Sequence, residues 1–315
     1  MLFFLVGRDR MNVYEKAGFV SAGTTQSSGQ QVTIAYPKRN ERRETTLLIE
    51  INSRDRNLVQ YPNASEFRFR LYRPLKDVVK IQIAGGTIPG CLYNLNTGWN
   101  QFTFLEGSTR WNVTIPPGRY TYETVCSKVA SILNTLSGIT NSYGITIDAT
   151  TGVFTLQRLT GSASFSFLFA TGDFVDFYDQ NNTLQKINSP AKLLGFGRGD
   201  YSSGTSSSIT APFVVDLEFI LNRAYVYINH DNTQDLNTIE RSVGRQQPHA
   251  IVYFDELRNN YKFLNKETFE PLYSSYPAPI SRIATIDIAL RDEFDRCIDL
   301  NGRDFTLLLE IVFLD

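Results

Sequence analysis

The sequence is poor in the residues that most often carry chemistry. Its 315 residues include only two histidines and three cysteines, and Cys91, Cys126 and Cys297 are scattered without a C-x-x-C pair. This leaves little material for a histidine general base, a cysteine-rich zinc site or a disulfide framework. We therefore expect reduced, buried thiols, no cofactor, no metal site and no enzymatic activity.

An excess of charge and a long apolar run are also missing. The chain has 31 Lys plus Arg against 32 Asp plus Glu. Without a basic excess, we expect no dedicated or sequence-specific binding of nucleic acid. The apolar run at residues 1–6 is far shorter than the roughly 20 residues of a membrane span, so no membrane span is expected. The content of 42% hydrophobic and 20% charged residues is that of a folded globular chain.

Residues 1–45 differ in composition from the rest. Between Val20 and Pro37 the chain carries no charge and includes the small, polar run SAGTTQSSGQQ, which is typical of a linker or arm. The 45 residues hold seven basic and four acidic side chains, a local net charge of +3. We predict an extended N-terminal arm over 1–45, either a partly ordered tail or a segment that lies on neighbouring subunits, and a folded domain over 46–315.

Alternation of apolar and polar residues predicts strands through most of this domain. Phe67–Leu71 (FRFRL) alternates with a period of two, the mark of a half-buried strand. Short segments of strand type, bounded by turn residues, recur through the chain: 46–51, 67–71, 78–84, 101–105, 111–115, 144–147, 153–157, 165–169, 213–220, 224–228, 250–255, 283–290 and 305–314. For Leu217–Arg223 a bulge or bend is the alternative to a strand. Because crossover helices are missing between the strands, a parallel α/β sheet is excluded.

One helix interrupts the strands. Thr121 is a candidate N-cap, and Val125, Val129 and Leu133 follow at helical spacing. Residues 195–208, rich in Gly and Ser, predict a long exposed loop, and we expect a loop or lobe insertion around residues 160–210. The predicted fold is all-β: an antiparallel β-sandwich of jelly-roll type with one amphipathic helix and long loops.

The most specific local pattern is Ile51-Asn-Ser-Arg-Asp-Arg-Asn57, followed by Tyr61-Pro-Asn63 and the strand at Phe67. It resembles the signature I-(D/N)-S-x-D-R-(N/D)…(Y/W)-P-(N/S)…F of structural proteins of large icosahedral double-stranded DNA viruses, the nucleocytoplasmic group that includes the chlorella viruses. Three further motifs occur in the same order in those capsid proteins: Ile115-Pro-Pro-Gly-Arg-Tyr-Thr121 with its helix, the Thr151-Gly152 hairpin, and Leu194-Gly-Phe196.

The resemblance spans roughly residues 46–315. It implies a jelly-roll penton or minor capsid protein, located in the virion and assembled in the infected host cell. It also implies self-association as a pentamer or another homo-oligomer, and contacts with the major capsid protein and with other minor capsid proteins.

Six residues are candidates for subunit contacts. Either Arg54, Asp55 and Arg56 form a local ion-pair turn, or one arginine reaches a neighbouring subunit. The large aromatic residues are either interface anchors or core residues. The candidates are Arg54, Asp55, Arg56, Tyr61, Tyr93 and Trp99.

Two other functions remain as alternatives. A carbohydrate- or receptor-binding β-sandwich of a virion spike or fibre would suit the aromatic content and the long Ser, Gly and Asn loops. The tripeptide Arg198-Gly-Asp200 matches a cell-adhesion sequence, but three residues recur often by chance, so we expect a plain surface loop. A glycosidase with paired carboxylates is disfavoured, since the Asp and Glu spacing indicates no such pair.

Overall fold

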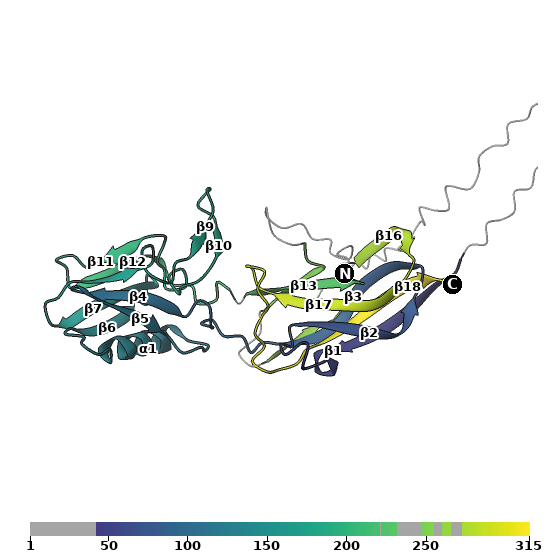
Figure 1. Ribbon diagram of the computed structural model, residues 1–315, viewed down its shortest axis with the longest axis horizontal. Coiled ribbons are helices and arrows are strands. Elements are labelled where there is room, and N and C mark those ends of the chain that lie inside the picture. Colours follow the sequence, from purple (N-terminus) through teal and green to yellow (C-terminus); the bar gives the residue numbers. More distant parts are fainter. Residues whose placement is uncertain (1–41, 221, 232–246, 255–259, 266–272) are drawn as a thin grey trace, which may run out of the picture. The chain divides into compact units, whose positions relative to one another are not determined.

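The computed structural model describes residues 42–220, 222–231, 247–254, 260–265 and 273–315 (Figure 1). Nearly all of the predicted arm, residues 1–41, therefore lies outside the described residues. The first described strand begins at Glu44, two residues before the predicted start of the folded domain.

Two antiparallel sheets form a jelly roll (Figure 1). The first sheet has the order β1-β18-β3, with β15 and β16 paired to different stretches of the other edge of β3. The second sheet has the order β14-β13-β17-β2. Their bounds are β1 (Glu44–Asn52), β2 (Glu66–Leu75), β3 (Val78–Pro89), β13 (Arg223–His230), β14 (Ala250–Tyr253), β15 (Tyr261–Leu264), β16 (Tyr273–Ile280), β17 (Ile283–Arg291) and β18 (Thr306–Leu314).

This strand order confirms the predicted fold class. If β15 and β16 are taken as one interrupted strand, the chain has eight strands, four in each sheet. Successive strands lie in opposite sheets except for the hairpin β13–β14, and the first and last strands are adjacent, as in a jelly roll. The β1–β18 pairing runs in unbroken register from Glu44 opposite Leu314 to Asn52 opposite Thr306. The two ends of the described chain are thus held side by side.

The jelly-roll core follows from the period-two pattern of its strands. Along β13, Ala224, Val226 and Ile228 are fully buried in the core between the sheets. The intervening Tyr225 and Tyr227 lie on the other face, where they form a small separate cluster with Ala289. Successive strand residues point to opposite faces, so β13 buries apolar side chains on both.

Residues 90–222, between β3 and β13, form an insertion with a second core of its own. Its elements are β4 (Gln101–Glu106), β5 (Thr109–Thr114), α1 (Tyr122–Asn134), β6 (Ser142–Ile147), β7 (Val153–Thr160), β8 (Phe165–Leu168), β9 (Phe177–Tyr178), β10 (Leu184–Lys186), β11 (Asp200–Ser202) and β12 (Ser208–Val214). They make two sheets, β11-β8-β4-β5 and β12-β7-β6, and the small β9–β10 pair. The insertion is therefore longer than the expected 160–210 region, which covers only its second half.

The predicted helix is confirmed as α1. Thr121 is its N-cap, and Thr121 and Thr124 form a reciprocal capping box. Val125, Val129 and Leu133 are fully buried in the insertion core. The helix packs on β6, and it is the one α-helix of the described residues.

Two local predictions need correction. The strand predicted at 213–220 ends with β12 at Val214, and residues 217–220 form a turn, which agrees with the alternative of a bend from Leu217. Glu218 N–H donates to the Asp216 carboxylate there. The apolar side chains of this turn region, Val215, Leu217 and Ile220, are nevertheless buried, which explains why the sequence resembles a strand there. The expected long loop at 195–208 contains the short strand β11, paired with β8.

The insertion core is dominated by phenylalanine. Phe167 is fully buried, and its ring centroid lies 5.5 Å from Phe102, 5.6 Å from Phe104 and 5.3 Å from Phe196. In a core packed this closely, the rings around Phe167 can move only slightly, so truncating its side chain leaves a cavity.

We predict that Phe167→Ala destabilises the insertion by about 3–5 kcal/mol, because it removes buried apolar surface and leaves a cavity. The matched control is Phe177→Ala in β9, whose side chain is 60% exposed; it should change stability by less than about 0.5 kcal/mol. Denaturant unfolding followed by near-ultraviolet circular dichroism measures both. Equal effects of the two substitutions would contradict this account of the core.

Candidate functional site: the arginine turn

The segment 52–62, which we call the arginine turn, joins β1 to β2 and contains the most specific motif of the sequence. After β1 the chain enters one turn of 3₁₀ helix at Ser53–Asp55. Asn52 caps this turn, since its side-chain oxygen accepts a hydrogen bond from Arg54 N–H at 3.0 Å. Asn is a favoured N-cap because it replaces a missing helical acceptor.

Ser53 connects the turn to the start of the last strand. Its side chain is fully buried and its hydroxyl donates to Asp304 Oδ1 at 2.9 Å. Its backbone N–H donates to Phe305 O, and Phe305 N–H donates to Ser53 Oγ, both at 2.9 Å. Three hydrogen bonds thus tie a residue after β1 to the residues before β18.

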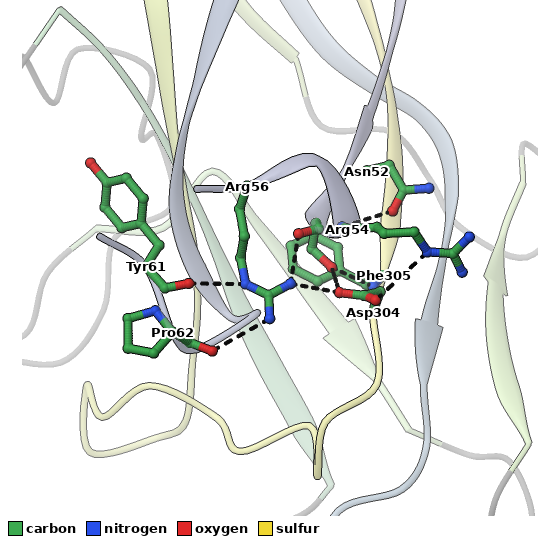
Figure 2. Close-up of polar contacts among 8 residues, drawn as sticks. Asn52, Arg54, Arg56, Tyr61, Pro62, Asp304 and Phe305 are labelled. Atoms are coloured by element: carbon green, nitrogen blue, oxygen red, sulfur yellow. Dashed lines mark hydrogen bonds and ion pairs between the residues drawn. The ribbon is translucent and has the colours of Figure 1, made fainter. Parts of the chain in front are cut away.

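Arg56 is the centre of the turn (Figure 2). Its Nη1 donates to Asp304 Oδ1 and to Ser53 O, both at 2.7 Å. Its Nε donates to Tyr61 O at 3.0 Å, and its Nη2 donates to Pro62 O at 3.4 Å. The Arg56 side chain is only 10% exposed. The guanidinium N–H groups therefore donate to acceptors of the same chain. The planar guanidinium holds its donors in a fixed geometry, which suits several acceptors at once.

The structure changes the partner assigned to the arginines. The sequence suggested a local pair with Asp55, but Asp55 is exposed and the carboxylate that both arginines approach is Asp304. Arg54 Nε lies 3.8 Å from Asp304 Oδ2, and the Arg54 side chain is 78% exposed. A distant and exposed pair of this kind contributes little, whereas the Arg56 pair is short and shielded.

The three aromatic candidates lie in different surroundings. Tyr61 packs partly on the jelly-roll core, and Figure 2 shows its ring pointing away from the Arg56 guanidinium while its carbonyl faces it. Tyr93 is half-buried. Trp99 is 9% exposed, donates from Nε1 to Asn94 O at 2.8 Å, and stacks under the Arg296 guanidinium at 4.2 Å.

The six candidates are therefore not gathered into one site. The structure brings Arg54, Arg56 and the Tyr61 backbone together around Asp304, and Trp99 has the core position that the sequence left open. A contact of any of the six with another subunit stays a prediction. Sequence reasoning missed Ser53 and Asp304, since their partners are about 250 residues away along the chain.

A second buried polar cluster lies in the insertion. Glu106, only 5% exposed, accepts hydrogen bonds from Tyr143 OH at 2.5 Å and from both Thr140 N–H and Thr140 Oγ1 at 2.7 Å. Asn141 donates to Tyr143 OH and to Ala163 O. Burial acts to raise the pKa of Glu106, but the hydrogen bonds from Tyr143 and Thr140 outweigh it and hold that pKa below its usual value.

Neither cluster has the composition of a catalytic or metal centre. Within the described residues, no group of three or more His, Cys, Asp or Glu side chains is placed to hold a metal ion. The described part of the chain also has no helix with the length and apolarity to cross a bilayer. Burial raises the pKa of Cys126 to about 11, which disfavours the thiolate that a nucleophile needs.

The strand order and the closing turn define a single jelly-roll protein with a large insertion between its third and fourth strands. The chain belongs to the family described as a family of unknown function (DUF5901), whose model matches residues 34–250. This range includes the arginine turn and the whole insertion.

Comparison with solved structures finds similarity to the mavirus penton protein, determined in selenomethionine-labelled form. The two share 11% identity with a TM-score of 0.42, over 87% of this chain and 100% of that chain. No curated protein matches the sequence.

The arginine turn yields a graded stability prediction. Arg56→Ala should lower the free energy of unfolding by about 2–3 kcal/mol, since charged hydrogen bonds of this kind contribute about 1.5–3 kcal/mol and Asp304 loses its nearest cation. Arg54→Ala, the matched control in the same turn, should cost less than about 0.5 kcal/mol. Urea unfolding of the two variants measures the difference. A larger loss for Arg54→Ala would overturn the assignment of Arg56 as the anchor.

Glu106 yields a pH prediction. Because its pKa is lowered in the folded state, its carboxylate stabilises the fold above the unfolded-state pKa of about 4.3, and this contribution is lost as pH falls below it. The stability difference between the natural protein and Glu106→Gln should therefore be largest near neutral pH and shrink in acid. Urea unfolding across a pH series measures it. Glu123→Gln, at an exposed position of α1, is the control, with a change below about 0.5 kcal/mol.

Proposed function

We propose that the chain is a structural subunit of an icosahedral virus shell: a penton or minor capsid protein that self-associates, as a pentamer or another homo-oligomer, and contacts the major and other minor capsid proteins in the virion. The role proposed is architectural, without catalysis or a cofactor. A jelly roll serves many functions, so the fold alone does not carry this proposal.

One observation carries the proposal. The viral signature, Ile51–Asn57 with Tyr61-Pro-Asn63, makes the arginine turn, the device that closes the jelly roll. Within it, Ser53 and Arg56 are both engaged by Asp304. The signature residues thus share one physical task in this chain, and proteins with the same signature are expected to build the same closure.

The arginine turn also presents apolar surface. Tyr61 N–H donates to Asn57 O at 2.7 Å, and the Asn57 side chain accepts from Val59 N–H at 3.0 Å, so the loop tip is held by its own hydrogen bonds. At this tip Val59 is 95% exposed and Leu58 is 63% exposed. Adjacent exposed apolar side chains on a fixed loop favour a protein contact.

The mechanism of assembly would be burial of such surfaces between neighbours. A specific interface buries about 1,200 Å² or more in total. A closed ring requires a head-to-tail contact, in which two different surfaces of the same chain meet.

The alternative, a carbohydrate- or receptor-binding sandwich of a spike or fibre, rests on the aromatic content and the long Ser, Gly and Asn loops, one of which contains the Arg-Gly-Asp tripeptide. The carboxylate of Asp200 accepts hydrogen bonds from Ala170 N–H, Thr171 N–H and Thr171 Oγ1. Arg198 donates to Asn182 and lies against the Tyr178 ring. Both charged groups of the Arg-Gly-Asp tripeptide are thus engaged within the chain.

We predict that the full chain forms a concentration-dependent oligomer, with a mass several times the 35.7 kDa of one chain. Light scattering after size-exclusion chromatography measures it, with and without residues 1–41, a deletion that spares every described strand.

Leu58→Asp with Val59→Asp should weaken association at least tenfold, because two charges would be buried at the contact. The control is Leu159→Asp, 61% exposed in the insertion. A strict monomer that also fails to bind capsid proteins would contradict the proposal.

A further inference from the structure

Strand pairing gathers separate basic residues at one end of the jelly roll. The turn between β2 and β3 contains Lys76 and is preceded by Arg73. Leu75 of β2 pairs with Ile283, and Val78 of β3 pairs with Ile280, so the β16–β17 turn with Arg282 lies beside it.

The start of β1 lies at the same end. Leu314 N–H donates to Asp77 O at 3.0 Å, and Asp315 N–H donates to Arg43 O at 2.9 Å. Segments that are far apart in the sequence therefore place their cations around the same two turns. We call this surface the basic end; its cations are Arg42, Arg43, Arg70, Arg73, Lys76 and Arg282, and all six are exposed.

Few carboxylates balance these six cations. Arg42 pairs with Asp77 at 2.7 Å, and the other five form no ion pair with a carboxylate of the described residues. The same turns and chain ends hold three carboxylates, Glu44, Asp77 and Asp315, which leaves a local excess of three positive charges although the whole chain has a net charge of −1.

The nearby carboxylates of the second sheet are already engaged. Asp287 pairs with Arg68 on the neighbouring strand. Asp231 accepts hydrogen bonds from Ala284 N–H and Thr285 N–H. Arg68 balances the charge of Asp287, whereas Asp231 keeps its negative charge because its donors are neutral. Counting Asp231 with the three carboxylates above leaves a local excess of two positive charges.

One aromatic side chain projects from the middle of these cations. Tyr72 is 94% exposed, and the Arg73 guanidinium lies 5.8 Å from its ring centroid. A lone tyrosine with flanking cations suits the interface of a bilayer, where tyrosine is enriched at the level of the headgroups. Binding of single-stranded nucleic acid typically uses several stacked aromatics along a groove, which the described part of this end does not offer.

We propose that the basic end binds the surface of a bilayer that contains anionic phospholipids. The arginines and Lys76 contact lipid phosphates, and Tyr72 enters the headgroup layer. Binding is peripheral and electrostatic, so it needs no membrane span.

This partner goes beyond assembly of a shell, because the basic end is separate from the apolar tip of the arginine turn. Along β1 the tip follows Asn52, whereas the basic end precedes Glu44. The two surfaces can therefore be altered one at a time.

The test is co-sedimentation of the full chain with phosphatidylcholine vesicles that contain or lack phosphatidylserine. We expect retention only by the anionic vesicles, and its loss at high salt, because screening shortens the range of these charges. Arg73→Glu with Lys76→Glu should weaken binding about 25-fold or more, since each basic residue near an anionic surface contributes about fivefold. Tyr72→Ser should weaken vesicle binding less than Arg73→Glu with Lys76→Glu does. Because Tyr72 contributes by entering the headgroup layer, salt should not screen its contribution.

The matched control is Lys128→Glu with Lys186→Glu, two exposed lysines of the insertion that give the same change of net charge. It should bind vesicles as the natural protein does. Equal loss in the control, or unchanged binding of the Arg73/Lys76 variant, would overturn the proposal. Tighter binding of duplex DNA at equal phosphate concentration would also overturn it in favour of nucleic acid. Light scattering of the Arg73/Lys76 variant should show unchanged self-association, which separates this result from the assembly test.

Discussion

The contact between the Arg56 guanidinium and the Asp304 carboxylate joins the beginning of the jelly roll to its end. A jelly roll must place its first and last strands side by side, and closing a loop of about 250 residues has an entropic cost that local contacts do not offset. Ser53 and Arg56 offset part of it by hydrogen-bonding the same carboxylate just before β18. Because the guanidinium also holds the Tyr61 and Pro62 carbonyls, it sets the path of the chain into β2.

The charged residues of this protein differ in their surroundings, which the net charge of the chain does not reveal. Arg56 and Asp304 are shielded and paired, as a charge taken from water must be. Glu106 is shielded and held by neutral donors, which keep it ionised. The cations of the basic end remain in solvent and largely unpaired. The near-zero net charge of the whole chain therefore gives no indication of this local positive surface.

The two cores show how an inserted segment is tolerated within a jelly roll. The chain leaves β3 after Pro89 and returns at Arg223, the first residue of β13, and between them the insertion forms a core whose buried residues all belong to it. The Glu106 cluster is built from residues of the insertion alone. The aromatic core has further contacts from outside it, since Phe294 packs against this core and the Arg296 guanidinium lies over Trp99. The jelly-roll strands on either side therefore need no contact from the insertion to complete their sheets, whose order is that of an uninterrupted jelly roll.

Patterns in the sequence were sufficient to predict many of the local elements. Period-two alternation located β2, a capping threonine with apolar residues at helical spacing located α1, and the lack of crossover helices indicated antiparallel sheets. It misplaced a strand at 213–220 because buried loop residues such as Leu217 are as apolar as strand residues. Which distant groups meet became visible in the fold: Asp304 as the partner of Arg56, the separate core of residues 90–222, and the cations of two turns and of the start of β1 at one end. The reason is physical, since local patterns depend on neighbours in the chain, whereas ion pairs and charged surfaces depend on strand pairing over long separations.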